Sequence, residues 1–351
     1  MRRRSVRWRK LERAVAMVRS QRRKERYVWK PGLELMAKMP QRVTGNEVNG
    51  LGDREARRPT PIMWHHPERI PDFAGIQEVV NKTYREHPKL GGAFSTPERK
   101  EPHAPIAEER LEDTPENWSR RVKEFALANE ADLVGITRVD QNAVFEGFEV
   151  HEPFIIVIGV YMDHPELAKA PRVDAAVEIA KQYNRGQRAA KKLANWIRGQ
   201  GWHAHGHGGP GAGGFLLIPH ALAAGLGELG KHGSIINREL GSSFRLAGVL
   251  TELPLASDER DSFGVDEFCI NCQLCTAACP PDAIFDEKQW VRGAKKWYVD
   301  FDKCMPYFAH THGCGICIAV CPWSRPGVAP KLAEKMTRRL GQTALAGERG
   351  E

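Results

Sequence analysis

The spacing of apolar residues becomes regular only from about Trp118 onward. Apolar positions recur at helical spacing from Val122 to Ala128 and predict a helix, which a short strand follows at 132–137. Residues 154–161 (FIIVIGVY) are apolar at nearly every position, which predicts a central strand with both faces covered. The pattern then predicts a long helix over about 173–198 and another strand at 244–250. This alternation indicates a layered α/β or α+β domain.

Residues 201–214 (GWHAHGHGGPGAGG) interrupt that pattern. Seven glycines and histidines at alternate positions predict an irregular loop rather than a helix or strand. Three interpretations stay open: a flexible surface loop, a loop whose backbone approaches a cofactor, and a histidine metal site. A helix and a glycine-rich turn are predicted next, over 219–232.

The pattern divides the chain into five parts. We expect a basic tail or amphipathic helix at 1–30, an irregular wrap rich in Pro, Gly and charge at 31–117, and a layered domain at 118–258. A cysteine-rich domain follows at 259–330 and a C-terminal tail at 331–351. A chain of 351 residues is long enough for two or three domains.

Charge is concentrated at the N-terminus. The chain carries a formal charge of +8, but residues 1–30 hold thirteen Lys or Arg and two Glu, or +11, which leaves −3 for the rest. A slightly acidic body argues against a nucleic-acid groove across the fold.

The basic segment begins Met-Arg-Arg-Arg, and paired arginines open twin-arginine export leaders. The uninterrupted apolar stretch of about 7–15 residues that a leader needs does not follow. No stretch reaches the roughly 18 apolar residues of a membrane span. We therefore expect a cytoplasmic protein. Trp8, Leu11, Val15 and Val18 recur at steps of three and four, so residues 1–30 could also contact a membrane or a partner.

All eight cysteines lie between Cys269 and Cys321. The first run has the spacing C-x2-C-x2-C-x3-C-P of bacterial two-cluster ferredoxins, and the second has a lone cysteine, nine residues, and then C-x2-C-x3-C-P. In that pattern the fourth cysteine of each run starts a helix and ligates the other cluster. The spacing thus predicts two [4Fe-4S] clusters, one on Cys269, Cys272, Cys275 and Cys321, the other on Cys304, Cys314, Cys317 and Cys279.

Disulfides and structural zinc explain the eight cysteines less well. Disulfides belong mainly to oxidising compartments and small secreted domains. Zinc sites built from C-x2-C pairs lack the third cysteine and the Cys-Pro that occur twice here.

Three further stretches carry a family resemblance: 224–233 (AGLGELGKHG), Arg245 ahead of 249–255 (VLTELPL), and 296–304 (KWYVDFDKC). Together with the cysteine runs they resemble the catalytic subunits of cobalamin-dependent reductive dehalogenases, over roughly residues 118–325. The resemblance implies an α+β fold: a nitroreductase-like α/β sandwich that binds base-off cobalamin, followed by a ferredoxin-like domain with two [4Fe-4S] clusters.

The resemblance also implies roles for individual residues. The Tyr and Arg assigned to substrate protonation fall on Tyr183 and Arg245. We expect cobalamin contacts from His205, His207, Gly225, Gly227, Lys231 and His232. The implied reaction takes an organohalide, two electrons and a proton to the dehalogenated product and halide. A low-potential donor such as ferredoxin or flavodoxin would supply the electrons.

The chain departs from the family in two ways, and two other functions stay open. It shows no export leader, and a polar residue that some members carry after the tyrosine-bearing helix has no clear counterpart, because the Gly/His loop stands there. The sister family, epoxyqueuosine reductase, resembles the same region, and a tRNA-modifying reductase is therefore the alternative. The other alternative is a non-catalytic electron carrier without corrinoid.

Overall fold

The computed structural model describes residues 27–94, 101–209 and 213–348, so most of the predicted basic segment lies outside the described residues. The N-terminal part contains α2 (Leu33–Met36), α3 (Gly45–Val48), η1 (Pro67–Arg69) and α4 (Ala74–Glu86). The middle part contains α6 (Pro115–Ala128), β1 (Leu133–Arg138), η2 (Gln141–Ala143), β2 (Phe154–Tyr161), α7 (His164–Leu167), α8 (Val173–Arg198), β3 (Ala204–His207), α9 (Leu217–Ala223), β4 (Glu228–Leu229), β5 (Ile235–Ile236) and β6 (Phe244–Thr251). The C-terminal part contains α10 (Val265–Asn271), α11 (Leu274–Ala278), β7 (Gln289–Val291), β8 (Ala294–Lys296), α12 (Phe301–His310), α13 (Ile316–Ala319), η3 (Pro322–Ser324) and α14 (Ala329–Glu348).

A four-stranded sheet in the order β1-β2-β6-β3 organises the middle part. All three neighbouring pairs are antiparallel. Strand β2 lies between β1 and β6 and is buried along almost its whole length, because its apolar residues face both covered sides. The prediction of a central strand at 154–161 is confirmed.

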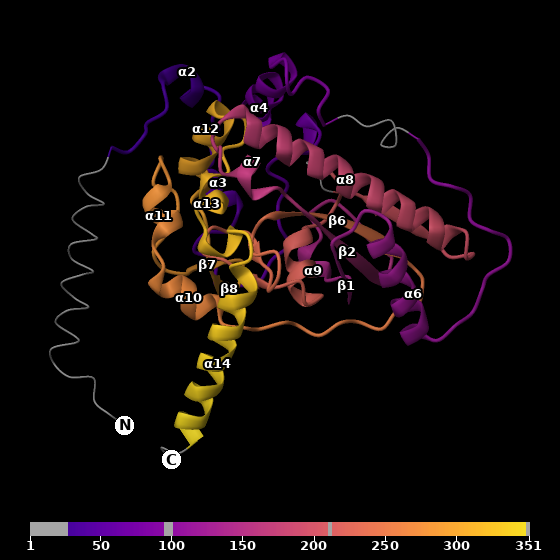
Figure 1. Ribbon diagram of the computed structural model, residues 1–351. Coiled ribbons are helices and arrows are strands. Elements are labelled where there is room, and N and C mark those ends of the chain that lie inside the picture. Colours follow the sequence, from indigo (N-terminus) through magenta and orange to yellow (C-terminus); the bar gives the residue numbers. More distant parts are fainter. Residues whose placement is uncertain (1–26, 95–100, 210–212, 349–351) are drawn as a thin grey trace.

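Helix α8 covers one face of this sheet and spans the predicted residues 173–198 (Figure 1). Its buried stripe includes Ala189, Leu193 and Ile197, which recur at steps of four. The helix approaches the sheet closely at Gly186, where a Cβ would lie 3.3 Å from the Cβ of Ala247. Apolar residues of α9 and of the segment around Val144 and Val150 cover the opposite face.

The prediction that 201–214 has no regular element is wrong in part, because Ala204–His207 form the edge strand β3. Ala204 and Gly206 point toward α8, and a Cβ on Gly206 would lie 2.8 Å from the carbonyl carbon of Ala190. Small residues therefore alternate with histidines because the helix leaves no room on its side. Glycine is here a packing requirement rather than a sign of an irregular loop.

The cysteine-rich part consists of short helices joined by turns. The expectation that the fourth cysteine of each run starts a helix holds for Cys321, which precedes η3, but not for Cys279, which follows the end of α11. Pro280 and Pro281 come next, and a residue that precedes proline is disfavoured in helical conformation.

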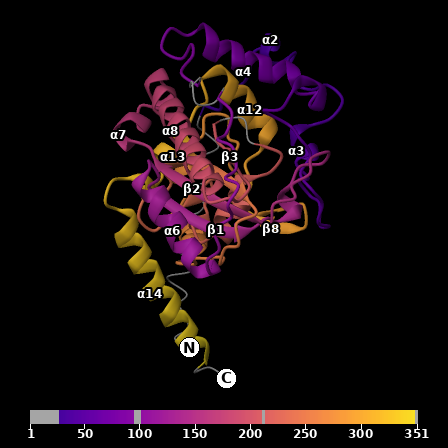
Figure 2. The same ribbon diagram turned by 90° about the vertical axis from the view of Figure 1, so that its right-hand side faces the viewer.

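Two regions predicted to lack long elements contain helices. Within the expected wrap, the 13-residue helix α4 packs Ile76 and Val80 against Met305 and Ala309, with Met305 and Ala309 on α12. In place of the expected C-terminal tail, α14 packs Ala329, Ala333 and Met336 on the cysteine-rich part and projects from the molecule (Figures 1 and 2). Both helices bury an apolar stripe at helical spacing, which the Pro-rich or charged surroundings obscured. Within the described ranges, no helix is both long and apolar enough to span a membrane.

Candidate functional site

The eight cysteines are free thiols that gather into two groups. Cys321 interacts electrostatically with Cys269, Cys272 and Cys275, and we name these four the first-run group. Cys317 interacts with Cys304, Cys314 and Cys279, and we name these four the second-run group. The structure thus brings the thiols together in the two crossed sets that the spacing predicted. Cys317 also interacts with Cys275, so the two groups are neighbours.

Burial makes these thiols poor acids. It raises the pKa of Cys269, Cys304 and Cys321 to about 12. Buried thiols of this kind form thiolates when a cation compensates their charge, as iron does in a cluster. No group of three or more His, Cys, Asp or Glu among the described residues is arranged to hold a single metal ion.

Lys231 lies beside the first-run group and is almost completely buried. Its backbone N–H donates to the sulfur of Cys269, and its Nζ donates to the carbonyl oxygen of Cys272 at 3.1 Å. The same Nζ lies 4.9 Å from the centre of the Trp297 ring. This ammonium group therefore places positive charge where a cluster with four thiolates would be negative.

His232 follows Lys231 and is buried as well. Burial lowers the pKa of His232 to about 4, so its imidazole is neutral at pH 7. The ring folds over Gly230, where a Cβ would lie 2.8 Å from Cε1. Its Nε2 has no hydrogen-bond partner among the residues that the structure describes. A buried polar atom without a partner is a candidate contact for a bound ligand.

Tyr183 and Arg245 meet on the α8 face of the sheet, although 62 positions separate them in the sequence. The Cζ of Arg245 lies 5.3 Å from the centre of the Tyr183 ring. Arg245 lies two positions before Ala247 on β6, so the two side chains share a face of the sheet. Ala247 packs against α8, and Arg245 therefore points to α8, which carries Tyr183. Its Nε is buried and lacks a hydrogen-bond partner within the described part of the chain. Tyr183 also packs in the same apolar cluster as Cys317 of the second-run group.

A second tyrosine, Tyr84, lies near this pair, and no sequence motif pointed to it. Tyr84 of α4 interacts electrostatically with both Tyr183 and Arg245. Phe94 contacts both tyrosines, with ring centres 5.0 Å from Tyr84 and 6.2 Å from Tyr183. The region expected to be an irregular wrap therefore reaches the candidate site. Only the amphipathic spacing of 74–86 could have indicated a helix that delivers Tyr84.

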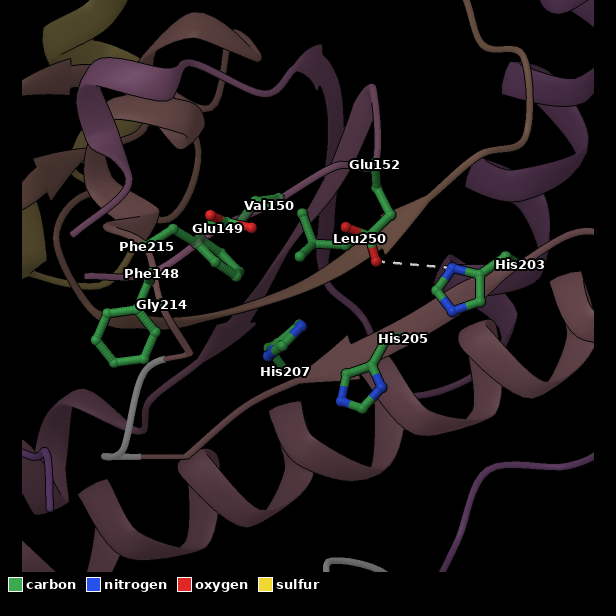
Figure 3. A pocket seen from close by; sticks show the side chains of 10 residues that line it. All are labelled: Phe148, Glu149, Val150, Glu152, His203, His205, His207, Gly214, Phe215 and Leu250. Atoms are coloured by element: carbon green, nitrogen blue, oxygen red, sulfur yellow. Dashed lines mark ion pairs between the residues drawn. The ribbon is translucent and has the colours of Figure 1, made fainter. Parts of the chain in front are cut away.

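His205 and His207 lie on the opposite face of the sheet from Tyr183 and Arg245. With His203 they line a pocket of about 310 Å³ (Figure 3). The rings of His205 and His207 are 4.6 Å apart, and His203 Nδ1 lies 3.6 Å from a carboxylate oxygen of Glu152. Burial lowers the pKa of His207 to about 3. The other walls are formed by Phe148, Glu149, Val150, Gly214, Phe215 and Leu250.

His103 extends the row of histidines along the edge of β3. Its ring centre is 4.4 Å from that of His205, and its Nε2 accepts a hydrogen bond from the N–H of Gly206 at 3.0 Å. Burial and the neighbouring charges lower the pKa of His103 to about 4. His103 and His207 are therefore neutral at pH 7, and His103 helps to hold the edge strand through its hydrogen bond with Gly206.

Gly225 and Gly227 serve the fold at close backbone contacts. Both have positive φ angles, and a Cβ would lie 2.4 Å from the carbonyl oxygen of Glu259 at Gly225 and 2.1 Å from that of Ile236 at Gly227. Packing alone thus explains both glycines, and their contact with a cofactor stays a prediction.

The chain is similar in sequence to proteins of known function. A family model described as "4Fe-4S dicluster domain" matches residues 268–324. The chain is 33% identical over 184 residues to a tetrachloroethene reductive dehalogenase of Desulfitobacterium hafniense, a match covering 49% of this chain and 33% of that protein. It is 34% identical over 127 residues to the epoxyqueuosine reductase of Salmonella typhimurium, covering 31% of this chain and 30% of that protein.

Among solved structures, one reductive dehalogenase aligns with a TM-score of 0.61 and 24% identity, over 78% of this chain and 40% of that chain. Its structure suggests a mechanism for B12-dependent dehalogenation. The chain is related to the reductive dehalogenases. The predicted fold class is confirmed: a mixed α/β part of this fold precedes a ferredoxin-like dicluster domain. The aligned region spans only about a third of the curated dehalogenase.

Proposed function

We propose that this protein is a corrinoid-dependent and iron–sulfur-dependent reductive dehalogenase that replaces a halogen by hydrogen on an organohalide. The observation that carries the proposal is the contact between Tyr183 and Arg245, with Tyr183 in the same apolar cluster as Cys317, in a chain related to reductive dehalogenases. A proton donor, a cation and an electron-transfer centre then stand side by side, which is what this reaction requires.

Two unpartnered buried atoms support a corrinoid at this site. The Nε2 of His232 and the Nε of Arg245 have no hydrogen-bond partner within the described ranges, and polar groups of a base-off cobalamin would satisfy both. When bound, the cofactor would supply the low-potential reduction of the carbon–halogen bond. The pocket at His205 and His207 lies on the opposite face of the sheet from Arg245, and its volume of about 310 Å³ is at the lower end of the about 300–1,000 Å³ typical of drug-sized ligands, so we do not place the corrinoid there.

The protein's own contribution is proton delivery and charge stabilisation. Tyr183 would give its phenolic proton to the carbon that loses halide, and the Arg245 guanidinium would stabilise the phenolate that remains. Electrons would come from a low-potential carrier such as ferredoxin or flavodoxin and pass between the two neighbouring cysteine groups.

The test begins with anaerobic reconstitution with iron, sulfide and cobalamin, followed by measurement of bound corrinoid. Halide release is then measured on a panel of haloalkenes and halophenols with a chemical reductant. Tyr183→Phe removes only the hydroxyl and should lower turnover by about 10²–10⁴-fold with cofactor content intact. Tyr298→Phe is the matched control, since its hydroxyl donates to Asn46 Oδ1 at 3.0 Å and has no contact with the Tyr183 and Arg245 pair among the described residues. Full activity of Tyr183→Phe would contradict the assignment.

The second candidate is a tRNA-modifying reductase, which the match to epoxyqueuosine reductase favours. Incubation of the reconstituted protein with epoxyqueuosine-containing tRNA separates the two. Conversion of the tRNA without halide release would replace the dehalogenase proposal. A protein that binds no corrinoid would instead fit a non-catalytic electron carrier.

A further inference from the structure

The hydroxyl of Tyr84 lies at the loop that carries Cys314 of the second-run group. A Cβ built on Gly313 would be 2.6 Å from the Oη of Tyr84, so the hydroxyl occupies the space that this glycine leaves free. Gly313 has a φ of 98° and directly precedes Cys314. Helix α4 is held in this place by its packing on α12. Tyr84 is therefore fixed to the cysteine-rich part rather than to the sheet.

The same side chain faces the Tyr183 and Arg245 pair. Tyr84 interacts electrostatically with both residues, and Phe94 contacts the rings of both tyrosines. Three elements distant in sequence, α4, α8 and β6, thus converge on one point. Tyr84 joins the pair to the loop of Cys314.

Burial decides what Tyr84 can do there. It raises the pKa of Tyr84 well above the usual range of a tyrosine, and the nearby Arg245 offsets this only in part. The phenol therefore keeps its proton at neutral pH and can only donate or accept hydrogen bonds. A buried neutral hydroxyl beside a site where negative charge develops is a hydrogen-bond donor to that charge.

We propose that Tyr84 is a positioning residue that donates its hydroxyl hydrogen bond to the Tyr183 oxygen after Tyr183 has protonated the substrate carbon. The proposal rests on the proposed dehalogenase function. Two electrons from a low-potential carrier and one proton from Tyr183 convert R–X to R–H and X⁻. Tyr84 loses no proton in this step, and solvent later restores the proton of Tyr183.

The experiment compares Tyr84→Phe with the control Tyr298→Phe in the reconstituted holoprotein. Tyr84→Phe keeps the ring that contacts Phe94 and removes only the hydroxyl, so fold and cofactor content should not change. Loss of a hydrogen bond to a charged group should lower kcat by about 10- to 100-fold. The KM for the organohalide should stay within about twofold, because the contact exists in the resting protein and strengthens only as charge develops on Tyr183.

A second measurement does not depend on activity. The protein is labelled with 3-fluorotyrosine, and the ¹⁹F resonance of Tyr183 is assigned by its loss in Tyr183→Phe. Its chain has only six tyrosines, so the spectrum is simple. In the oxidised holoprotein this resonance should shift in Tyr84→Phe and stay in place in Tyr298→Phe.

The outcomes are distinguishable. A Tyr183 resonance that does not respond to loss of the Tyr84 hydroxyl overturns the proposal, whatever the activity. A shifted resonance with unchanged kcat overturns the positioning role and leaves only a contact. If the unmodified holoprotein releases no halide from any substrate, the proposed function fails and the role of Tyr84 in it fails too, while the resonance still reports whether the two side chains meet.

Discussion

The two faces of the four-stranded sheet carry ionisable side chains of different origin. On the α8 face, Tyr183 and Arg245 come from different elements and meet beside a cysteine group. On the opposite face, His205 and His207 come from strand β3 and His203 directly precedes it, and the three line a small pocket with Glu152 (Figure 3). The row of histidines is the more conspicuous feature of the sequence, yet it lies on the face away from the candidate proton donor.

The difference shows that a regular row of ionisable residues in the sequence does not mark the place where groups from distant elements meet. Alternate residues of any strand share a face, so three histidines at odd positions form a row without further help from the fold. A phenol and a guanidinium from α8 and β6 meet only because the helix packs on the sheet. The following experiments test this contrast, from the largest expected effect to the smallest.

The crossed cysteine sets should control which cluster is lost. Cys321→Ala removes one ligand of the first-run group, so bound iron should fall from about eight atoms to about four and turnover should cease. Alkylation followed by mass spectrometry should then find Cys269, Cys272 and Cys275 reactive. The four cysteines of the second-run group, Cys279, Cys304, Cys314 and Cys317, should be protected. Ser262→Ala, at an exposed position, is the control. Protection of the first run with exposure of Cys304, Cys314 and Cys317 would refute the crossover.

Removing the charge at the α8 face should affect turnover and not folding. Arg245→Leu should lower kcat by about 10²–10³-fold, as expected for loss of one group that stabilises developing charge. Arg245→Lys should retain part of the activity, because the charge remains while the planar guanidinium is lost. Steady-state kinetics at equal corrinoid content gives the result. Equal activity of the Leu variant and the unmodified protein would remove Arg245 from the mechanism.

The edge strand β3, which carries His205 and His207, should respond in stability. Gly206→Ala introduces a Cβ 2.8 Å from the carbonyl carbon of Ala190 and should lower the free energy of unfolding by about 1–3 kcal/mol. Gly341→Ala is the matched control, because nothing lies within 4 Å of its Cβ and alanine favours a helix by about 1 kcal/mol. Denaturant unfolding measures both. A Gly206→Ala protein as stable as the original would mean that β3 can move away from α8.

The smallest effect concerns pH. Because His103 and His207 have pKa values of about 4 and about 3 in the folded protein, below 6.5 in the unfolded chain, the unfolded state binds more protons in between. Stability should therefore be complete above about pH 6.5 and fall as the pH is lowered toward 4. Unfolding midpoints from pH 7.5 to 4.5 test this. His207→Gln should flatten the dependence, and an unchanged slope would show that His207 titrates normally.

Much of the dicluster region could be predicted from the sequence alone. Cluster ligands repeat at short, fixed intervals because a few turns of backbone must surround one cubane, so spacing carries the information. The crossed grouping follows the same pattern. In the structure Cys321 joins the cysteines of the first run and Cys279 joins those of the second, as expected. The strand at 154–161 can also be predicted from the sequence, since burial on both faces requires an unbroken run of apolar residues.

The tertiary structure alone decided what stands next to what. Part of the glycine-rich segment 201–214 forms the edge strand β3, and it has glycine at position 206 because α8 lies too close there for a side chain. The tertiary structure also brought α4 onto α12 and so delivered Tyr84 to the Tyr183 and Arg245 pair, for which no motif exists. Motifs record contacts between residues near one another in the chain. Contacts between distant elements depend on which apolar faces bury one another, and a single sequence states the faces but not their partners.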